Sequence, residues 1–196
     1  NNGGSIQIIT NSGDLIIQNA LIQTNGSNGR GGSMGLSAAN NVLIESSTFE
    51  ATGWTHGGTI KIGNDASDGT LPFAFNTSID AHTQISTQSL DPVNGLGGLI
   101  ETSAHTLNLL GSINAGRGGM WLIDPYNYTI GSAQASSIAS ALTSGTTVTI
   151  ETSVNTSSYG SSGSSSDMGD IFINSNISRT ATGTATLIFK AARHVI

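Results

Sequence analysis

The sequence has no cysteine, few charged residues and few aromatic residues. Without cysteine no disulfide framework can form. Many proteins lack this residue, and its absence also suits a chain that crosses a membrane unfolded, where early disulfides would obstruct passage. Charged residues make up only 9% of the chain, which argues against a disordered acidic or basic tail because such tails carry high net charge. No apolar run approaches the ~20 residues of a transmembrane helix, and the start at Asn1 lacks the basic and apolar regions of a signal peptide.

The few charges are mostly acidic. The chain carries 6 Lys and Arg against 12 Asp and Glu, which gives a formal net charge of −6. The basic residues are scattered along the sequence, so no basic patch exists that would neutralise phosphates. We therefore expect no nucleic-acid partner. Asn, Ser, Thr and Gly supply the polarity instead, which is typical of short strands joined by tight turns.

A glycine pair recurs along the chain, each time followed by one variable residue, an apolar residue, a spacer and usually a second apolar residue. The pairs are Gly3-Gly4, Gly31-Gly32, Gly57-Gly58, Gly97-Gly98 and Gly118-Gly119. Self-similarity at this period is the signature of stacked repeats, and apolar residues two positions apart indicate strands. Three apolar stretches separated by turn residues follow each of the clearest pairs. The sequence therefore predicts an all-β fold, a right-handed parallel β-helix with three short strands per coil.

Stacked coils bring equivalent apolar residues into interior ladders, because parallel coils bury one face of every strand. We expect no single repeat to be stable alone, since neighbouring coils complete each other's strand pairing. The predicted ladders are Ile6, Met34, Ile60, Ile100, Trp121; Ile8, Leu36, Ile62, Thr102, Ile123; Ile17, Ile44, Phe75, Leu109, Ile150; and Ile22, Phe49, Ile79 or Ile85, Ile113.

The chain reads as one solenoid segment over residues 1–196. Glycine-pair coils occupy residues 1–117, with an insertion near 64–94 that we expect to form loops or hairpins. Residues 118–196 continue the coils with two additions. A short helix is predicted near 132–143, with Ser132 as its N-cap and Gly145 just past its end. A Ser/Gly loop at 157–167 is expected to be mobile and to be cut first by proteases.

The last part of the chain returns to strand-like sequence. Gly169–Ile173 is predicted to restart the coil phrase. Both ends of the chain fall within strand-like phrases, and neither looks like a capping unit. We therefore expect this chain to be an excerpt of a longer protein, and we expect the isolated segment to associate end to end through open strand edges and exposed apolar residues.

Two passages carry a family resemblance. The first is Gly118–Pro125, followed by Tyr128–Ile130, Ala141-Leu142 and Gly145–Ile150, and the second is Gly169–Ile173 with Leu187 and Phe189 behind it. Together they resemble filamentous-haemagglutinin-type exoproteins, the large passengers of two-partner secretion in Gram-negative bacteria. The glycine-pair coils before them fit the same family but are shared by other solenoids.

The resemblance implies a secreted chain that passes unfolded through a partner outer-membrane barrel and folds on the bacterial cell surface. Its expected role is structural and presentational, as a segment of an adhesin or fibre that mediates cell attachment or extracellular assembly. Expected partners are the secretion barrel, a host, neighbouring-cell or matrix surface including its glycans, and further copies of the chain. Neither the family's secretion domain nor a toxin domain is visible in this sequence.

Sites for metals or catalysis are not expected. His56, His82, His105 and His194 are far apart and occupy unlike positions in their repeats, whereas zinc needs convergent ligands. The loop 64–69 (NDASDG) is oxygen-rich, as calcium sites are, but it lacks a closing Glu, so a solvated turn is the simpler interpretation. The carboxylates are spread singly through the coils, whereas glycosidases need a facing pair; these residues are Asp14, Glu45, Glu50, Asp80, Glu101 and Glu151.

We therefore expect no enzyme activity, no metal and no cofactor. The alternative function is a carbohydrate-binding or carbohydrate-active β-helix, similar to polysaccharide lyases and hydrolases, with loops 64–94 and 157–167 forming its cleft. Trp54 is the candidate for glycan or partner contact, against the simpler interpretation of a turn residue packed on its neighbour. An ice-binding surface is not expected, because its Thr residues would have to fall in one register. The candidates do not: Thr87, Thr106, Thr147 and Thr149.

Overall fold

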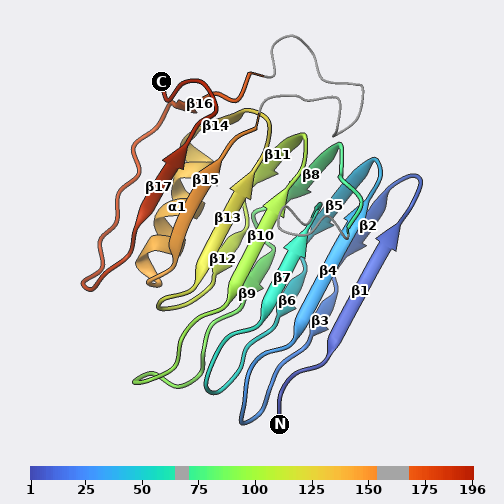
Figure 1. Ribbon diagram of the computed structural model, residues 1–196, viewed down its shortest axis with the longest axis vertical. Coiled ribbons are helices and arrows are strands. Elements are labelled where there is room, and N and C mark those ends of the chain that lie inside the picture. The colour runs from blue at the N-terminus through green and yellow to red at the C-terminus, as the bar shows by residue number, and fades with distance from the viewer. Residues whose placement is uncertain (65–70, 154–167) are drawn as a thin grey trace.

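The computed structural model describes residues 1–64, 71–153 and 168–196. Nearly all of its regular structure is β-strand, and every strand pair is parallel. Figure 1 shows one long sheet facing the viewer, with rows of shorter strands behind it. This arrangement confirms the predicted all-β, parallel, solenoid-like class.

The largest sheet has seven strands in chain order: β1 (Ser5–Thr10), β4 (Ser33–Ala38), β7 (Thr59–Ile62), β10 (Leu99–Ser103), β13 (Met120–Asp124), β15 (Thr147–Glu151) and β17 (Leu187–Lys190). A second sheet contains β2 (Leu15–Gln18), β5 (Asn41–Glu45), β8 (Asn76–Ile79) and β11 (Thr106–Leu109). A third contains β3 (Leu21–Gln23), β6 (Thr48–Glu50), β9 (Gln84–Ser86) and β12 (Ser112–Asn114). Two further strands, β14 (Tyr128–Ile130) and β16 (Ile171–Ile173), pair with each other.

The core consists of ladders of apolar side chains that face inward between the sheets. The first two predicted ladders are confirmed, and β15 extends them with Val148 and Ile150. Polar Thr102 is tolerated in this interior because its hydroxyl accepts a hydrogen bond from the indole N–H of Trp121 at 3.0 Å. Both residues are fully buried, so this bond satisfies polar atoms that would otherwise be costly to desolvate.

The fourth predicted ladder is confirmed with Ile85, one of its two alternatives, whereas the third differs from the prediction at two positions. Ile150 belongs to the second ladder, next to Ile123, because β15 pairs with β13 in the long sheet. Ile44 pairs with Ile79, not Phe75, and Ile79 pairs with Leu109. Phe75 directly precedes β8, is 46% exposed and stacks on the His105 ring. The prediction was wrong because residues 64–94 were taken as one insertion. They include β8 and β9, and the additional residues lie before β8 and after β9.

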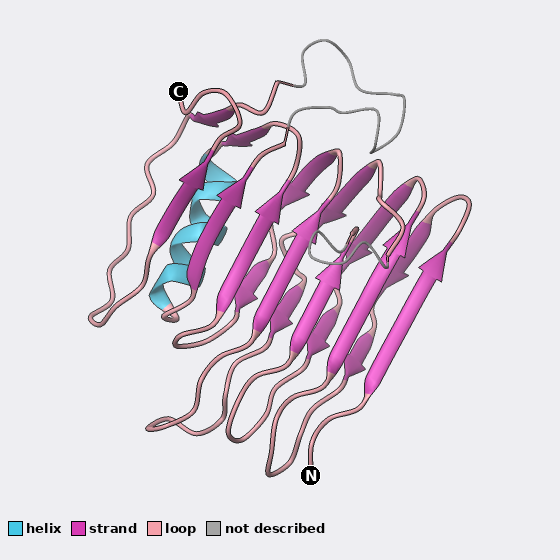
Figure 2. Ribbon diagram, viewed as in Figure 1, coloured by secondary structure: helices cyan, strands magenta, loops and turns pink. Residues whose placement is uncertain are grey.

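The predicted helix is confirmed as α1 (Ser132–Thr143), but its N-cap is Gly131 rather than Ser132, and no side chain caps it. Its C-terminal end matches the prediction, since Gly145 follows with a positive φ of 86°. Helix α1 packs against β12 and β11, each the last strand of its sheet. Figure 2 shows the helix, in cyan, at the C-terminal end of the stack. The helix therefore covers strand edges that would otherwise be open.

The C-terminal strands are arranged differently from the prediction. Gly169–Ile173 was expected to restart the coil phrase, but its strand β16 pairs with β14, and β17 takes the next place in the long sheet. The side-chain oxygen of Asn127 explains this placement, because it accepts the backbone N–H groups of Gly169 and Asp170 at 3.0 and 2.9 Å. The predicted loop 157–167 lies outside the described residues. Within the parts of the chain that are described, no helix is long and apolar enough to span a membrane.

Candidate functional site

Trp54, the contact residue predicted from the sequence, lies in a turn between two isolated β-bridges at Gly53 and His56. Its side chain is 48% exposed. Its carbonyl oxygen accepts hydrogen bonds from the Ser89 hydroxyl and from the backbone N–H of Asp91. The turn is thus fixed by its neighbour while the indole stays accessible, and its contact with a glycan or partner remains a prediction.

The structure brings together no metal-binding set in the parts it describes. No group of three or more His, Asp or Glu side chains there is placed to hold a metal ion. Of the acidic loop 64–69, only Asn64 belongs to the described residues, and it is buried. His82 instead lies 3.4 Å from the carboxylate of Asp80 on the surface.

An aromatic cluster that the sequence analysis missed lies where the chain leaves the long sheet. Phe75 stacks on His105 with 4.8 Å between ring centroids. His105 meets Tyr126 edge-on at 4.7 Å, and Tyr126 stacks on Phe73 at 5.7 Å. The residues come from three different coils, so only folding places them side by side. Phe73 and Tyr126 also line a small cavity of about 20 Å³, together with Asn64, Asp124, Pro125 and Ser153.

Asp124 lines this cavity and is affected by the charges of Glu101 and Glu151, which the sequence analysis took as isolated positions. Asp124 ends β13, Glu101 lies in the neighbouring strand β10, and Glu151 ends β15. Burial is the main cause that raises the pKa of Asp124 to about 7, and the charges of Glu101 and Glu151 contribute to the same rise. Glu101 accepts a hydrogen bond from Ser103 at 3.2 Å.

Basic residues flank the carboxylates on both sides. Lys190 lies 3.0 Å from Glu151, and Lys61 stands opposite Glu101 in the strand register. A carboxylic acid that is protonated near neutrality is a feature of general acids. The cavity beside Asp124, however, is about the size needed by a single water molecule. We therefore expect this cluster to affect the pH dependence of folding.

Stability should fall as the pH rises from 5 to 8, because folded Asp124 binds its proton more tightly than the unfolded chain does. Protonation of Asp124 favours the folded state below its folded pKa. The difference of roughly 3 pKa units corresponds to about 4 kcal/mol over the whole titration, and roughly two-thirds of this loss falls between pH 5 and 8. Replacing Asp124 by Asn should remove most of this slope and raise stability at pH 8. Urea unfolding at both pH values measures the effect. An unchanged slope in the variant would show that another group titrates.

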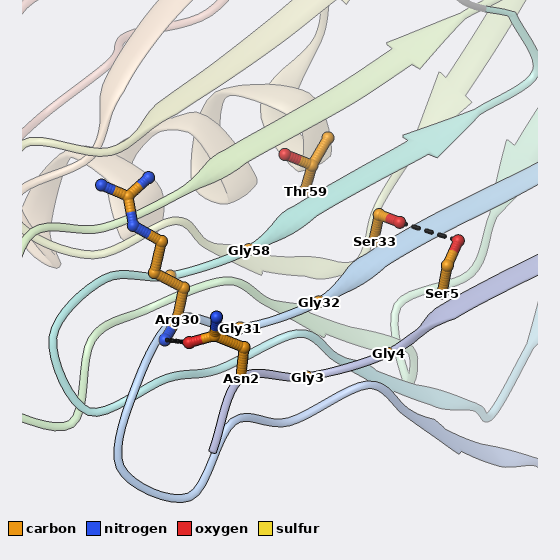
Figure 3. Close-up of a pocket in the computed structure, with 11 residues that line it drawn as sticks. Asn2, Gly3, Gly4, Ser5, Arg30, Gly31, Gly32, Ser33, Gly58 and Thr59 are labelled. Atoms are coloured by element: carbon orange, nitrogen blue, oxygen red, sulfur yellow. Dashed lines mark hydrogen bonds between the residues drawn. The ribbon is translucent and has the colours of Figure 1, made fainter.

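A polar groove runs across the starts of β1, β4 and β7 and has a volume of about 600 Å³. Its floor is made of the first three glycine pairs. Figure 3 shows Asn2 and Arg30 before the glycines and Ser5, Ser33 and Thr59 after them, with the three hydroxyl side chains on the same side of the sheet. The Ser33 hydroxyl donates to that of Ser5 at 2.9 Å.

The glycines are required by the close approach of neighbouring backbones. A Cβ atom on Gly31 would overlap the carbonyl of Ala51, and one on Gly58 would overlap the carbonyl of Gly32. Gly4 differs, because no atom lies within 4 Å of the place where its Cβ would be. The groove is therefore a consequence of tight coil stacking, which leaves a row of positions without side chains. No family model, curated protein or solved structure matches this chain.

Proposed function

We propose that this chain is a scaffold segment of a large secreted bacterial surface adhesin or fibre of the filamentous haemagglutinin type. The coil contains three strands, which is supported by the way β1, β2 and β3 enter three different sheets and β4, β5 and β6 enter the same three in turn. It is right-handed, as crossover connections between parallel strands almost always are. The resemblance of residues 118–150 and 169–173 to the passengers of this family supports the assignment of the chain to that class of exoprotein.

One observation carries the proposal: a single parallel sheet runs from Ser5 to Lys190, through almost the whole chain. Every unit uses its backbone to hold the next, and its apolar residues to fill the shared core. Such an architecture is suited to extending and presenting a surface rather than to enclosing a substrate. Low charge and absent cysteine are compatible with passage through an outer-membrane partner in an unfolded state.

The location is tested in the source cells with an antibody raised against this chain. We expect intact cells to be labelled and added protease to remove the label, while a periplasmic marker protein stays intact. Deletion of the partner barrel gene should abolish surface labelling. Deletion of the gene that encodes this chain should lower attachment to cells or surfaces. Labelling only after permeabilisation, with attachment unchanged, would contradict the proposal.

A further inference from the structure

The groove over the first three glycine pairs has a floor in which the N–H groups of the second and third pairs are already hydrogen-bonded. The N–H groups of Gly31 and Gly57 donate to the carbonyls of His56 and Leu96, at 3.0 and 2.8 Å. Those of Gly32 and Gly58 donate to the carbonyls of Thr24 and Ala51 in the preceding coils, both at 2.7 Å. A ligand that lies across these two pairs therefore finds no free N–H groups in them, and its recognition comes from the side chains along the two rims.

The rims are polar along their whole length. Asn2 and Arg30 precede the glycines, and Ser5, Ser33 and Thr59 follow them. The hydroxyl residues are in strand register, Ser5 opposite Ser33 and Ser33 opposite Thr59, so they repeat about every 4.8 Å along the stack. Hydroxyl and amide groups both donate and accept hydrogen bonds. The groove thus suits a ligand that is itself rich in hydroxyl groups and repeats along one direction.

Arg30 adds a positive charge that the protein leaves unused. The side chains of Arg117 and Arg179 bind backbone carbonyls, and those of Lys190 and Arg193 bind carboxylates. Among the described residues the Arg30 guanidinium, by contrast, has no hydrogen-bond acceptor or carboxylate partner, and Arg30 is exposed. No acidic residue lines the groove. The local field is therefore positive although the net charge of the chain is −6, and it favours an anionic ligand.

The polar rim ends where the sequence of the repeat changes. In the next unit, Leu96 and Leu99 flank the glycine pair in place of polar residues, and neither lines the groove. The glycines continue in that unit, so the stacking requirement alone does not explain the hydroxyl residues of the first three. Figure 3 shows the hydroxyl row and Arg30 on either side of the glycine floor.

We propose that this groove binds a linear glycan that carries carboxylate groups, lying along the stack with one sugar carboxylate on Arg30. The planar guanidinium matches a carboxylate in a two-point contact, while the hydroxyl row meets successive sugar rings. The volume of about 600 Å³ lies within the range of known ligand sites. This binding site is independent of the proposed scaffold role and does not use the loops 64–94 and 157–167.

Calorimetric titration with a galacturonate hexamer tests the proposal, in the presence of EDTA so that calcium cannot bridge the two partners. We expect saturable binding at one site per chain. Arg30→Gln should weaken binding at least about tenfold, the loss expected for one charge-assisted hydrogen-bond pair. Ser33→Ala should also weaken it, because Ser33 lines the groove as the central member of the hydroxyl row. The thermal unfolding midpoint should change little in either variant.

Lys190→Gln is the matched control, since it removes an exposed positive charge at the far end of the same sheet. It should leave binding unchanged. Maltohexaose, a neutral linear glycan, should bind at least tenfold more weakly than the galacturonate hexamer. The proposal is overturned by absent binding, by equal affinity for the neutral glycan, or by equal losses in Lys190→Gln and Arg30→Gln. Loss of the proposed surface location would leave all of these results unaffected.

Discussion

Replacing Ile44 by aspartate is expected to destabilise the chain by about 4 kcal/mol, because it places an unpaired carboxylate inside the apolar core. Ile44 is 1% exposed and stands between Ile17 and Ile79 in adjacent strands. Stability in a stacked array depends on contacts between neighbouring coils, so the damage should reach both of them. Urea unfolding followed by far-UV circular dichroism measures the loss, and limited proteolysis locates it.

The matched control is Ile16→Asp. Ile16 lies in the adjacent strand β2, but its side chain points outward and is 58% exposed. The same substitution there should cost less than about 1 kcal/mol, the range of strand propensities. Equal losses at the two positions, or unchanged protease resistance in Ile44→Asp, would show that the assigned inward face of the second sheet is incorrect.

Gly58→Ala is expected to cost about 3 kcal/mol, which is large for the addition of one methyl group. The added Cβ would overlap the Gly32 carbonyl, and backbone atoms of Gly31 and Ala51 lie within 3 Å of it. These atoms belong to the adjacent coil and cannot rotate away as a flexible side chain does. The carbonyl of Gly32 also accepts the N–H of Thr59 at 2.9 Å, so relief of the overlap would disturb the strand pairing.

Gly4→Ala provides the control within the same motif, since Gly4 is the second glycine of its pair as Gly58 is. Its Cβ would meet no atom within 4 Å. Alanine there should be neutral or slightly stabilising, because it restricts the unfolded chain. Thermal unfolding of both variants under one condition compares them. A loss in Gly4→Ala as large as that in Gly58→Ala would mean that backbone flexibility, rather than close packing, requires these glycines.

The sequence by itself determined the class of fold and most of the core. The glycine pairs marked the start of each unit, and the alternation after them identified which residues face inward, so that Ile60, Ile100 and Trp121 were placed in one ladder. The helix at 132–143 was also predictable, because its composition and the glycine beyond it are local signals. These features depend on residues that are close in the chain, where the spacing of the apolar residues indicates which face of an element is buried.

Only the tertiary structure decided which coil position each residue takes where the repeat length changes. The added residues before β8 made its register with β5 unpredictable from the sequence. Because β8 pairs with β5 and β11, Ile79 and not Phe75 is the core residue of this coil. The position of β16 beside β14 likewise depends on Asn127, which lies more than forty residues before it.

The candidate sites were hidden from the sequence for the same physical reason. Asp124, Glu101 and Glu151 are far apart along the chain. Only folding buries Asp124 and brings the other two charges near it, and together these effects raise its pKa to about 7. The polar groove likewise needs three coils in register before Ser5, Ser33 and Thr59 form one row. Local pattern fixes the face on which a side chain lies, whereas its neighbours on that face are set by the length of every turn between the coils.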